Sequence, residues 1–140
     1  MRMLTRVLLL GCEPRLLEPR AVVLSHFWAV ATALVRWDER EIHKAFVKAD
    51  VVVLSNDVPE ELRHRWIEEI RENSPEKVLI QMDELDCGPV RGLDAMVAVG
   101  SGPGALVATI YGLLCERGMA SRGWQSLETT LLDDVRGPVQ

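Results

Sequence analysis

Residues 50–61 read DVVVLSNDVPEE, and this stretch decides the fold. The run DVVVL at 50–54 is rich in β-branched valine, which favours a strand, and a polar cluster at 55–57 ends it. Pro59 then begins a helical pattern whose acidic first turn complements the helix dipole. A short apolar strand that leads directly into a helix is typical of a parallel sheet covered on both faces. The stretch therefore predicts a central strand, and ligands of such sheets bind beyond the carboxyl ends of the strands.

Strands and helices alternate through most of the chain. Further apolar runs of strand length lie at 6–11, 28–34, 77–82 and 94–100. Apolar residues recur at helical spacing at 16–26, at 39–49, after Pro59 and at 105–119. This order predicts an α/β fold, a three-layer doubly wound parallel sheet of five strands with right-handed crossovers.

Three segments depart from a regular alternation. Residues 83–93 hold two glycines and a proline and show no helical period, so the fourth crossover helix is predicted to be short or missing. Pro19 is compatible with the first helix only if that helix begins near it. Residues 120–140 are predicted to form a C-terminal tail outside a single domain at 1–119, and the string LETTLLDDV within the tail fits a short amphipathic helix.

The composition is that of an ordinary globular protein, with 48% hydrophobic and 26% charged residues among 140. The net charge of -5 and the lack of a basic block exclude a nucleic-acid surface, which needs clustered Lys and Arg to neutralise phosphates. No apolar stretch approaches the roughly 20 residues that span a bilayer, and none resembles a signal peptide. We therefore expect a cytoplasmic protein with neither a nucleic-acid nor a membrane partner.

Cysteine and histidine offer no evident metal site. Cys12, Cys87 and Cys115 have no CxxC spacing, and an odd number of cysteines is a poor disulfide framework, so we expect reduced thiols. The histidines are widely separated and lack an acidic or cysteine partner at metal-ligand spacing. We expect neither a metal ion nor a cofactor.

Several local strings resemble the receiver domain of bacterial response regulators, the CheY-like family, over about residues 6–114. In that family an apolar strand leads to an acidic pair, a third acidic residue, a proline and a leucine-rich helix. The string LLLGCEPRLLE follows this frame, with Gly11 and Cys12 in place of the acidic pair and Glu13 at the third position. The resemblance implies a flavodoxin-like sheet with strand order 2-1-3-4-5.

The other chemical positions of that family also differ in this sequence. Ser55 occupies the position of the aspartate that accepts phosphate in the family, and Pro59 matches the proline that follows four residues later. Met82 stands where the fourth strand carries a phosphate-sensing hydroxyl, and Val99 where the fifth strand carries a lysine. Phosphorylation needs a carboxylate that forms an acyl phosphate and oxygen ligands for Mg²⁺, and Gly, Cys and Ser supply no such charge. The resemblance therefore implies a degenerate receiver without its phosphorylation site, and not an enzyme.

A receiver frame without its chemistry predicts a phosphorylation-independent signalling or scaffold module, a pseudo-receiver that binds a protein partner. A second copy of the chain is one candidate partner. The last predicted helix carries small residues that permit close approach, namely Ala105, Ala108, Thr109 and Gly112.

A small-ligand or nucleotide-binding domain that uses the carboxyl edge of the sheet is the alternative function. The residues that would line such a site are Ser55, Asn56, Asp57, Ser101 and Gly102. The last two belong to a glycine-rich turn at 100–104 before a helix N-terminus, which suits an anion. The plainer interpretation, which we favour, is that Ser55 and Asp57 cap the next helix or satisfy turn amides and that the glycines only turn the chain.

An enzyme is the hypothesis with the least support. Cys12 and Ser55 are the candidate nucleophiles, but no histidine is evidently placed to activate the thiol and no GxSxG elbow surrounds the serine.

Overall fold

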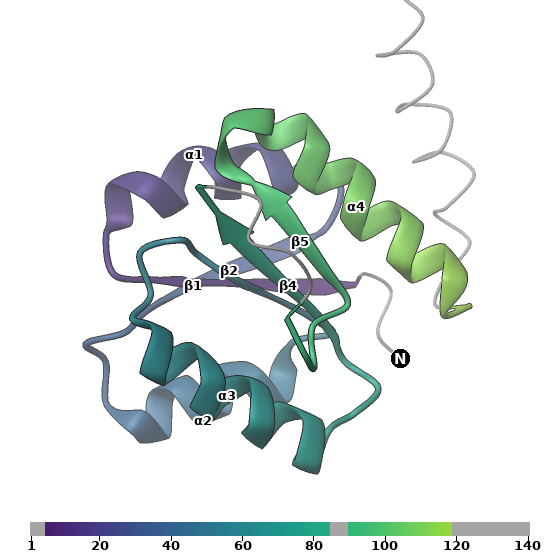
Figure 1. The fold of residues 1–140 in the computed structure, drawn as a ribbon. Helices are drawn as coiled ribbons and strands as arrows, with labels where there is room; N and C mark the ends of the chain where they lie inside the picture. The colour runs from purple at the N-terminus through teal and green to yellow at the C-terminus, as the bar shows by residue number, and fades with distance from the viewer. Residues whose placement is uncertain (1–4, 85–89, 119–140) are drawn as a thin grey trace, which may run out of the picture.

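The computed structural model describes residues 5–84 and 90–118 as a five-stranded sheet with helices on both faces (Figure 1). The strands are β1 (Arg6–Gly11), β2 (Ala29–Leu34), β3 (Val51–Leu54), β4 (Val78–Asp83) and β5 (Ala95–Ala98). The helices are α1 (Pro14–Leu24), α2 (Glu39–Lys48), α3 (Glu60–Asn73) and α4 (Pro103–Glu116), with a 3-10 turn η1 at Val99–Ser101. All paired strands are parallel, in the order β2-β1-β3-β4-β5. The predicted α/β fold and strand order are confirmed.

Two apolar layers hold the helices to the sheet. Figure 1 shows α1 and α4 on one face and α2 and α3 on the other. Because successive side chains of a strand point to opposite faces, β1 sends Val7 and Leu9 into the α1/α4 layer and Leu8 and Leu10 into the α2/α3 layer. β3 is buried over its whole length, as a central parallel strand requires. No helix among the described residues is long and apolar enough to cross a membrane.

The strand register places three of the predicted site residues together. Leu54, the last residue of β3, pairs with the residue directly before Gly11 in β1 and with the residue directly before Met82 in β4. One residue further along, Gly11, Ser55 and Met82 therefore stand side by side at the carboxyl edge. The alternation of side chains turns all three positions toward the α1/α4 layer.

Helix α1 differs from its prediction at its start. It begins at Pro14, where helical spacing predicted a start at residue 16, and Pro19 lies inside it. Proline suits the first helical position because its missing N–H needs no partner there. Pro19 removes one interior hydrogen bond, but Leu17 and Leu24 are both buried and hold the helix on the sheet on either side of it. The expectation that the helix begins near Pro19 is therefore wrong.

The connection from β4 to β5 holds no helix among its described residues, 84 and 90–94. This agrees with the predicted loss of the fourth crossover helix. β5 itself is shorter than the predicted run at 94–100, because the chain coils into the 3-10 turn η1 directly after Ala98.

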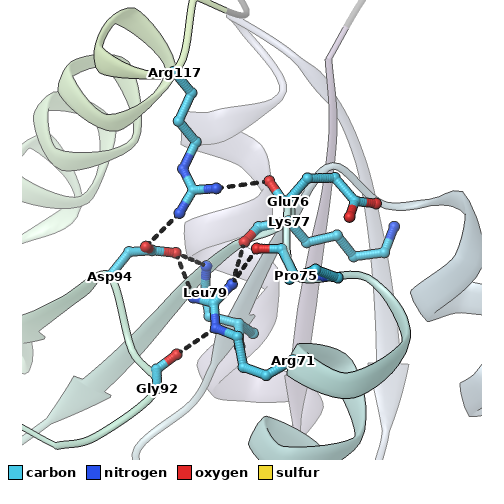
Figure 2. Close-up of polar contacts among 8 residues, drawn as sticks. All are labelled: Arg71, Pro75, Glu76, Lys77, Leu79, Gly92, Asp94 and Arg117. Atoms are coloured by element: carbon cyan, nitrogen blue, oxygen red, sulfur yellow. Dashed lines mark hydrogen bonds and ion pairs between the residues drawn. The ribbon is translucent and has the colours of Figure 1, made fainter.

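Charged side chains fasten this connection to two helices (Figure 2). Asp94, directly before β5, accepts hydrogen bonds from the Leu79 N–H and from Nη2 of Arg71, each at 2.7 Å, and forms an ion pair with Arg117. Arg71 also donates from Nε to the Gly92 carbonyl oxygen at 2.7 Å. The cluster joins the C-terminal ends of α3 and α4 to the start of β5.

Asp94 is ionised at neutral pH. Burial acts to raise its pKa, but the hydrogen bonds that it accepts and the charges of Arg71 and Arg117 outweigh burial and hold the pKa below its usual value. Arg71 further donates to the carbonyl oxygens of Pro75 at 2.9 Å and Lys77 at 2.8 Å. One guanidinium thus satisfies backbone acceptors on both sides of β4.

Candidate functional site

The loops that follow β1 and β3 are joined by hydrogen bonds at the carboxyl edge. The carboxylate of Asp57 accepts from the Cys12 N–H, 3.1 and 3.2 Å from its two oxygens, and from the Glu13 N–H at 2.8 Å. The Cys12 thiol also donates to the Asp57 carbonyl oxygen at 3.2 Å. The N-terminal end of α3, at Pro59, has no side-chain cap. Asp57 therefore satisfies amides of the neighbouring loop and does not cap the helix that follows it.

Ser55 lies against a basic side chain from α1. Arg20 donates from Nη1 to Ser55 Oγ at 3.0 Å and from Nη2 to Asn56 Oδ1 at 3.2 Å. Arg20 is 8% exposed and Ser55 is 1% exposed. Burial lowers the pKa of Arg20 from its ordinary value while the charge of Asp57 acts in the opposite direction, and a guanidinium remains charged in proteins. A buried cation thus engages the Ser55 hydroxyl.

Gly11 stands where a larger residue does not fit without displacing its neighbours. A Cβ built at this position would lie 2.9 Å from Asp57 Oδ1, 2.9 Å from Ser55 Cβ and 3.0 Å from Leu17. An acidic side chain at Gly11 would therefore have to displace the Asp57 carboxylate or shift the end of β3.

Cys12 and Ser55 are not activated as nucleophiles. Burial raises the pKa of the Cys12 thiol, and the charges of Asp57 and Glu13 raise it further. The thiolate is the reactive form of cysteine, so Cys12 stays in its unreactive form at neutral pH. The Ser55 hydroxyl contacts Arg20 and Asn56, and neither side chain is a base that could take its proton.

The remaining predicted positions lie apart from these hydrogen bonds. Met82 is buried in the α1/α4 layer, and Val99 packs against the same layer. Ser101 is exposed, while Gly102 adopts a φ of 82°, which favours glycine, and has open space at its Cβ position. Among the described residues no hydrogen bond joins Ser101 or Gly102 to the loop at 55–57.

The two residues at the end of β1 differ from the acidic ligands that a magnesium ion prefers. Mg²⁺ prefers an octahedron of oxygen ligands, and the strand end at Gly11 and Cys12 offers no carboxylate. The Asp57 carboxylate already accepts backbone hydrogen bonds, and Ser55 is engaged by Arg20. No group of three or more His, Cys, Asp or Glu side chains able to hold a metal gathers in the part of the chain that the structure describes.

Arg20 is the residue of this edge that the sequence analysis missed. A signal exists, because Leu17, Arg20 and Leu24 are spaced as one face of a helix and are the buried residues of α1. A charged residue within an apolar stripe needs a buried polar partner. The polar cluster after the central strand was the evident candidate for that partner.

The sequence matches no protein-family model and no curated protein. The structure, however, is similar to solved receiver domains. A response regulator receiver domain protein from Clostridium thermocellum has a TM-score of 0.69 at 18% identity, over 83% of this chain and 98% of that chain. The response regulator DrrB of Thermotoga maritima, an OmpR/PhoB homolog, has a TM-score of 0.66 at 20% identity over 83% of this chain, which spans only 54% of DrrB. The fold is that of a receiver domain.

A third similar structure contains a partner protein. It is the histidine kinase ThkA in complex with the response regulator TrrA, with a TM-score of 0.63 at 21% identity over 79% of this chain and 98% of the matched chain. At these identities the likeness establishes the fold, and function has to be argued from the site.

Proposed function

We propose that this chain is a phosphorylation-independent, receiver-like module for signalling or scaffolding that acts by binding a protein partner. The observation that carries the proposal is the contact of Arg20 with Ser55 and Asn56 at the carboxyl edge of the central strand. A phosphate-responsive receiver needs a carboxylate there, with space for the phosphoryl group and its metal ion. In this chain a serine occupies the position and a buried guanidinium covers it.

Several independent positions support the same conclusion. We propose that the residues at the positions of the degenerate phosphorylation site are Gly11, Cys12, Glu13, Ser55, Met82 and Val99. Replacement of one of them would still leave a binding site for phosphate or metal. Replacement of the acidic pair, the acceptor, the hydroxyl and the lysine together removes the acceptor carboxylate along with the groups that would hold the metal ion and the phosphoryl group. The close packing around Gly11, where a larger side chain would have to displace Asp57, Ser55 or Leu17, supports the proposed loss of the acidic pair.

The proposed partner is a protein, and a second copy of the chain is one candidate. The receiver in the ThkA–TrrA complex gives a precedent for protein binding by this fold. Helix α4 has no charged residue before Glu116, and Gly104, Ala108 and Gly112 are exposed on it. Light scattering over a range of protein concentrations tests self-association, and Ala108→Arg should abolish any dimer that uses this face. A monomer at every concentration would rule out the second copy as partner.

A phosphotransfer assay tests phosphorylation independence. The chain is incubated with acetyl phosphate and Mg²⁺, and its intact mass is measured beside that of the DrrB receiver domain, which has been solved in a BeF3-activated form. We expect a phosphoryl adduct on DrrB and none on this chain. An adduct on this chain, mapped to any residue of the carboxyl edge, would contradict the proposal.

A small-ligand or nucleotide-binding domain is the second candidate. It rests on the exposed Ser101 and the open space at Gly102, directly before the N-terminal end of α4. A ligand that binds only the folded state raises the melting temperature. A thermal-shift series with nucleotides that leaves the melting temperature unchanged would eliminate this candidate.

A further inference from the structure

A cleft of about 510 Å³ lies between helix α2 and strand β2, away from the residues discussed so far. Four alanines line it, Ala29 and Ala31 from β2 together with Ala45 and Ala49 from α2 and its C-cap. Alanine side chains are too short to fill the space between a helix and a sheet, which explains the hollow. Trp37 also lines the cleft and is 42% exposed. The lining therefore suits an apolar occupant.

Charge around the cleft selects the kind of occupant. Arg6, Lys44 and Lys48 line it, whereas Glu41 is its one acidic lining residue and lies 3.5 Å from Lys44 Nζ. This local excess of positive charge contrasts with the net charge of -5 for the whole chain. An occupant with apolar anchors and acidic flanks would complement the cleft.

The chain itself contains a segment of this chemistry. Residues 127–135, LETTLLDDV, lie outside the described residues and carry three acidic side chains and no basic one. Leu127, Leu131 and Val135 recur every four residues, the spacing of the anchors by which amphipathic helices bind apolar grooves.

The length of the intervening chain permits the contact. Arg117, at the end of α4, bonds to Glu76 and Asp94, which precede β4 and β5, so α4 ends at the amino edge of the sheet. The cleft reaches the same edge at Arg6 and Ala29. Four strand spacings of about 4.8 Å and, at right angles to them, one layer of about 10 Å separate the two places, so the straight-line distance between them is roughly 22 Å. The eight residues 119–126 extend up to about 27 Å.

We propose that residues 127–135 occupy the cleft between α2 and β2 of the same chain, with Leu127, Leu131 and Val135 on the alanines and the acidic residues toward Lys44 and Lys48. β2 is an edge strand of the sheet, and proteins commonly cover such an edge to prevent pairing with other chains. The segment thereby covers the outer edge of the sheet.

Amide NMR spectra of the full chain test the contact. We expect Leu131→Asp to shift the amide signals of Ala31, Trp37 and Ala45, because an added carboxylate withdraws the anchor from the apolar cleft. Ser121→Asp is the matched control, since it adds the same charge to the tail outside the segment, and it should leave the three signals in place. Unchanged cleft signals in Leu131→Asp would overturn the proposal.

A substitution in the cleft serves as a reciprocal test, because a substitution in the tail could shift cleft signals without a direct contact. Lys44→Glu, at an exposed position of α2, should shift the amide signals of residues 131–134. Light scattering on the wild-type chain and on Leu131→Asp distinguishes a segment that docks on its own chain from one that docks on a second copy. We expect Leu131→Asp to leave the oligomeric state unchanged, and a dimer that Leu131→Asp dissociates would overturn the proposal in favour of docking on a second copy.

Discussion

Replacing Arg20 by methionine removes the guanidinium from Ser55 while an unbranched side chain continues to fill the space along α1. The two hydrogen bonds lost are those to Ser55 Oγ at 3.0 Å and to Asn56 Oδ1 at 3.2 Å. Hydrogen bonds to charged groups contribute about 1.5–3 kcal/mol each. The desolvation of the buried guanidinium opposes them and also disappears with the substitution. We therefore expect the free energy of unfolding to fall by about 2 kcal/mol.

Urea unfolding followed by circular dichroism at neutral pH measures this loss, with an unchanged slope as the sign that the unfolded state is unaffected. Arg15→Met is the matched control, because Arg15 is exposed on the same helix, and it should change stability by less than about 0.5 kcal/mol. Ser55→Ala completes a double-mutant cycle, in which we expect a coupling energy above about 0.5 kcal/mol with Arg20→Met. Equal stabilities of the two arginine variants, or zero coupling, would show that the guanidinium does not hold Ser55.

Three further predictions concern other contacts. Asp94→Asn should lower stability by about 2 kcal/mol at neutral pH because its two arginine partners lose a partly buried carboxylate. The folded pKa of Asp94 is depressed, so its contribution is present above the ordinary aspartate pKa of about 4 and is lost as pH falls through the folded pKa. Urea titrations at neutral and acid pH measure the difference, and a cost independent of pH would contradict it. Cys12 should react with iodoacetamide more slowly than the exposed Cys115, as followed by peptide mass spectrometry, and faster reaction at Cys12 would disprove the raised pKa. Gly11→Ala should cost about 1–3 kcal/mol in the urea assay, whereas Gly112→Ala, with nothing within 4 Å, should stabilise α4 by up to about 1 kcal/mol; similar effects at both glycines would contradict the crowding at Gly11.

The fold could be predicted because its determinants are local in the sequence. The valines of β3 are β-branched, which favours a strand. A strand that is buried on both faces needs apolar residues at successive positions and not only at alternate ones, so DVVVL identifies a central strand by itself. The helical spacing of Ile42 and Phe46 likewise identifies the buried face of α2. Helix starts were less predictable, as Pro14 and Pro19 show, because tertiary packing compensates for a missing interior hydrogen bond.

The contacts at the carboxyl edge were missed because they join residues far apart in the chain. Arg20 and Ser55 are 35 residues apart, and Asp57 and Cys12 are 45 residues apart. Spacing alone predicted that Asp57 caps the helix that follows it or satisfies turn amides, whereas the parallel pairing of β1 with β3 brings it to the amides of the loop after a neighbouring strand. Asp94 was assigned to a strand for the same reason, although its arginine partners lie at the ends of two different helices.

The most direct measurement of phosphorylation independence is an amide NMR titration of the full chain with beryllofluoride and Mg²⁺. Beryllofluoride mimics a phosphoryl group on an aspartate, and the DrrB receiver domain serves as a positive control. We expect no change in the signals of Gly11, Cys12 and Ser55, because Arg20 and Asp57 already satisfy the polar groups of this edge. Shifts that begin around Ser55 and saturate with beryllofluoride would show that the site still accepts a phosphoryl group, in direct contradiction of the proposed function.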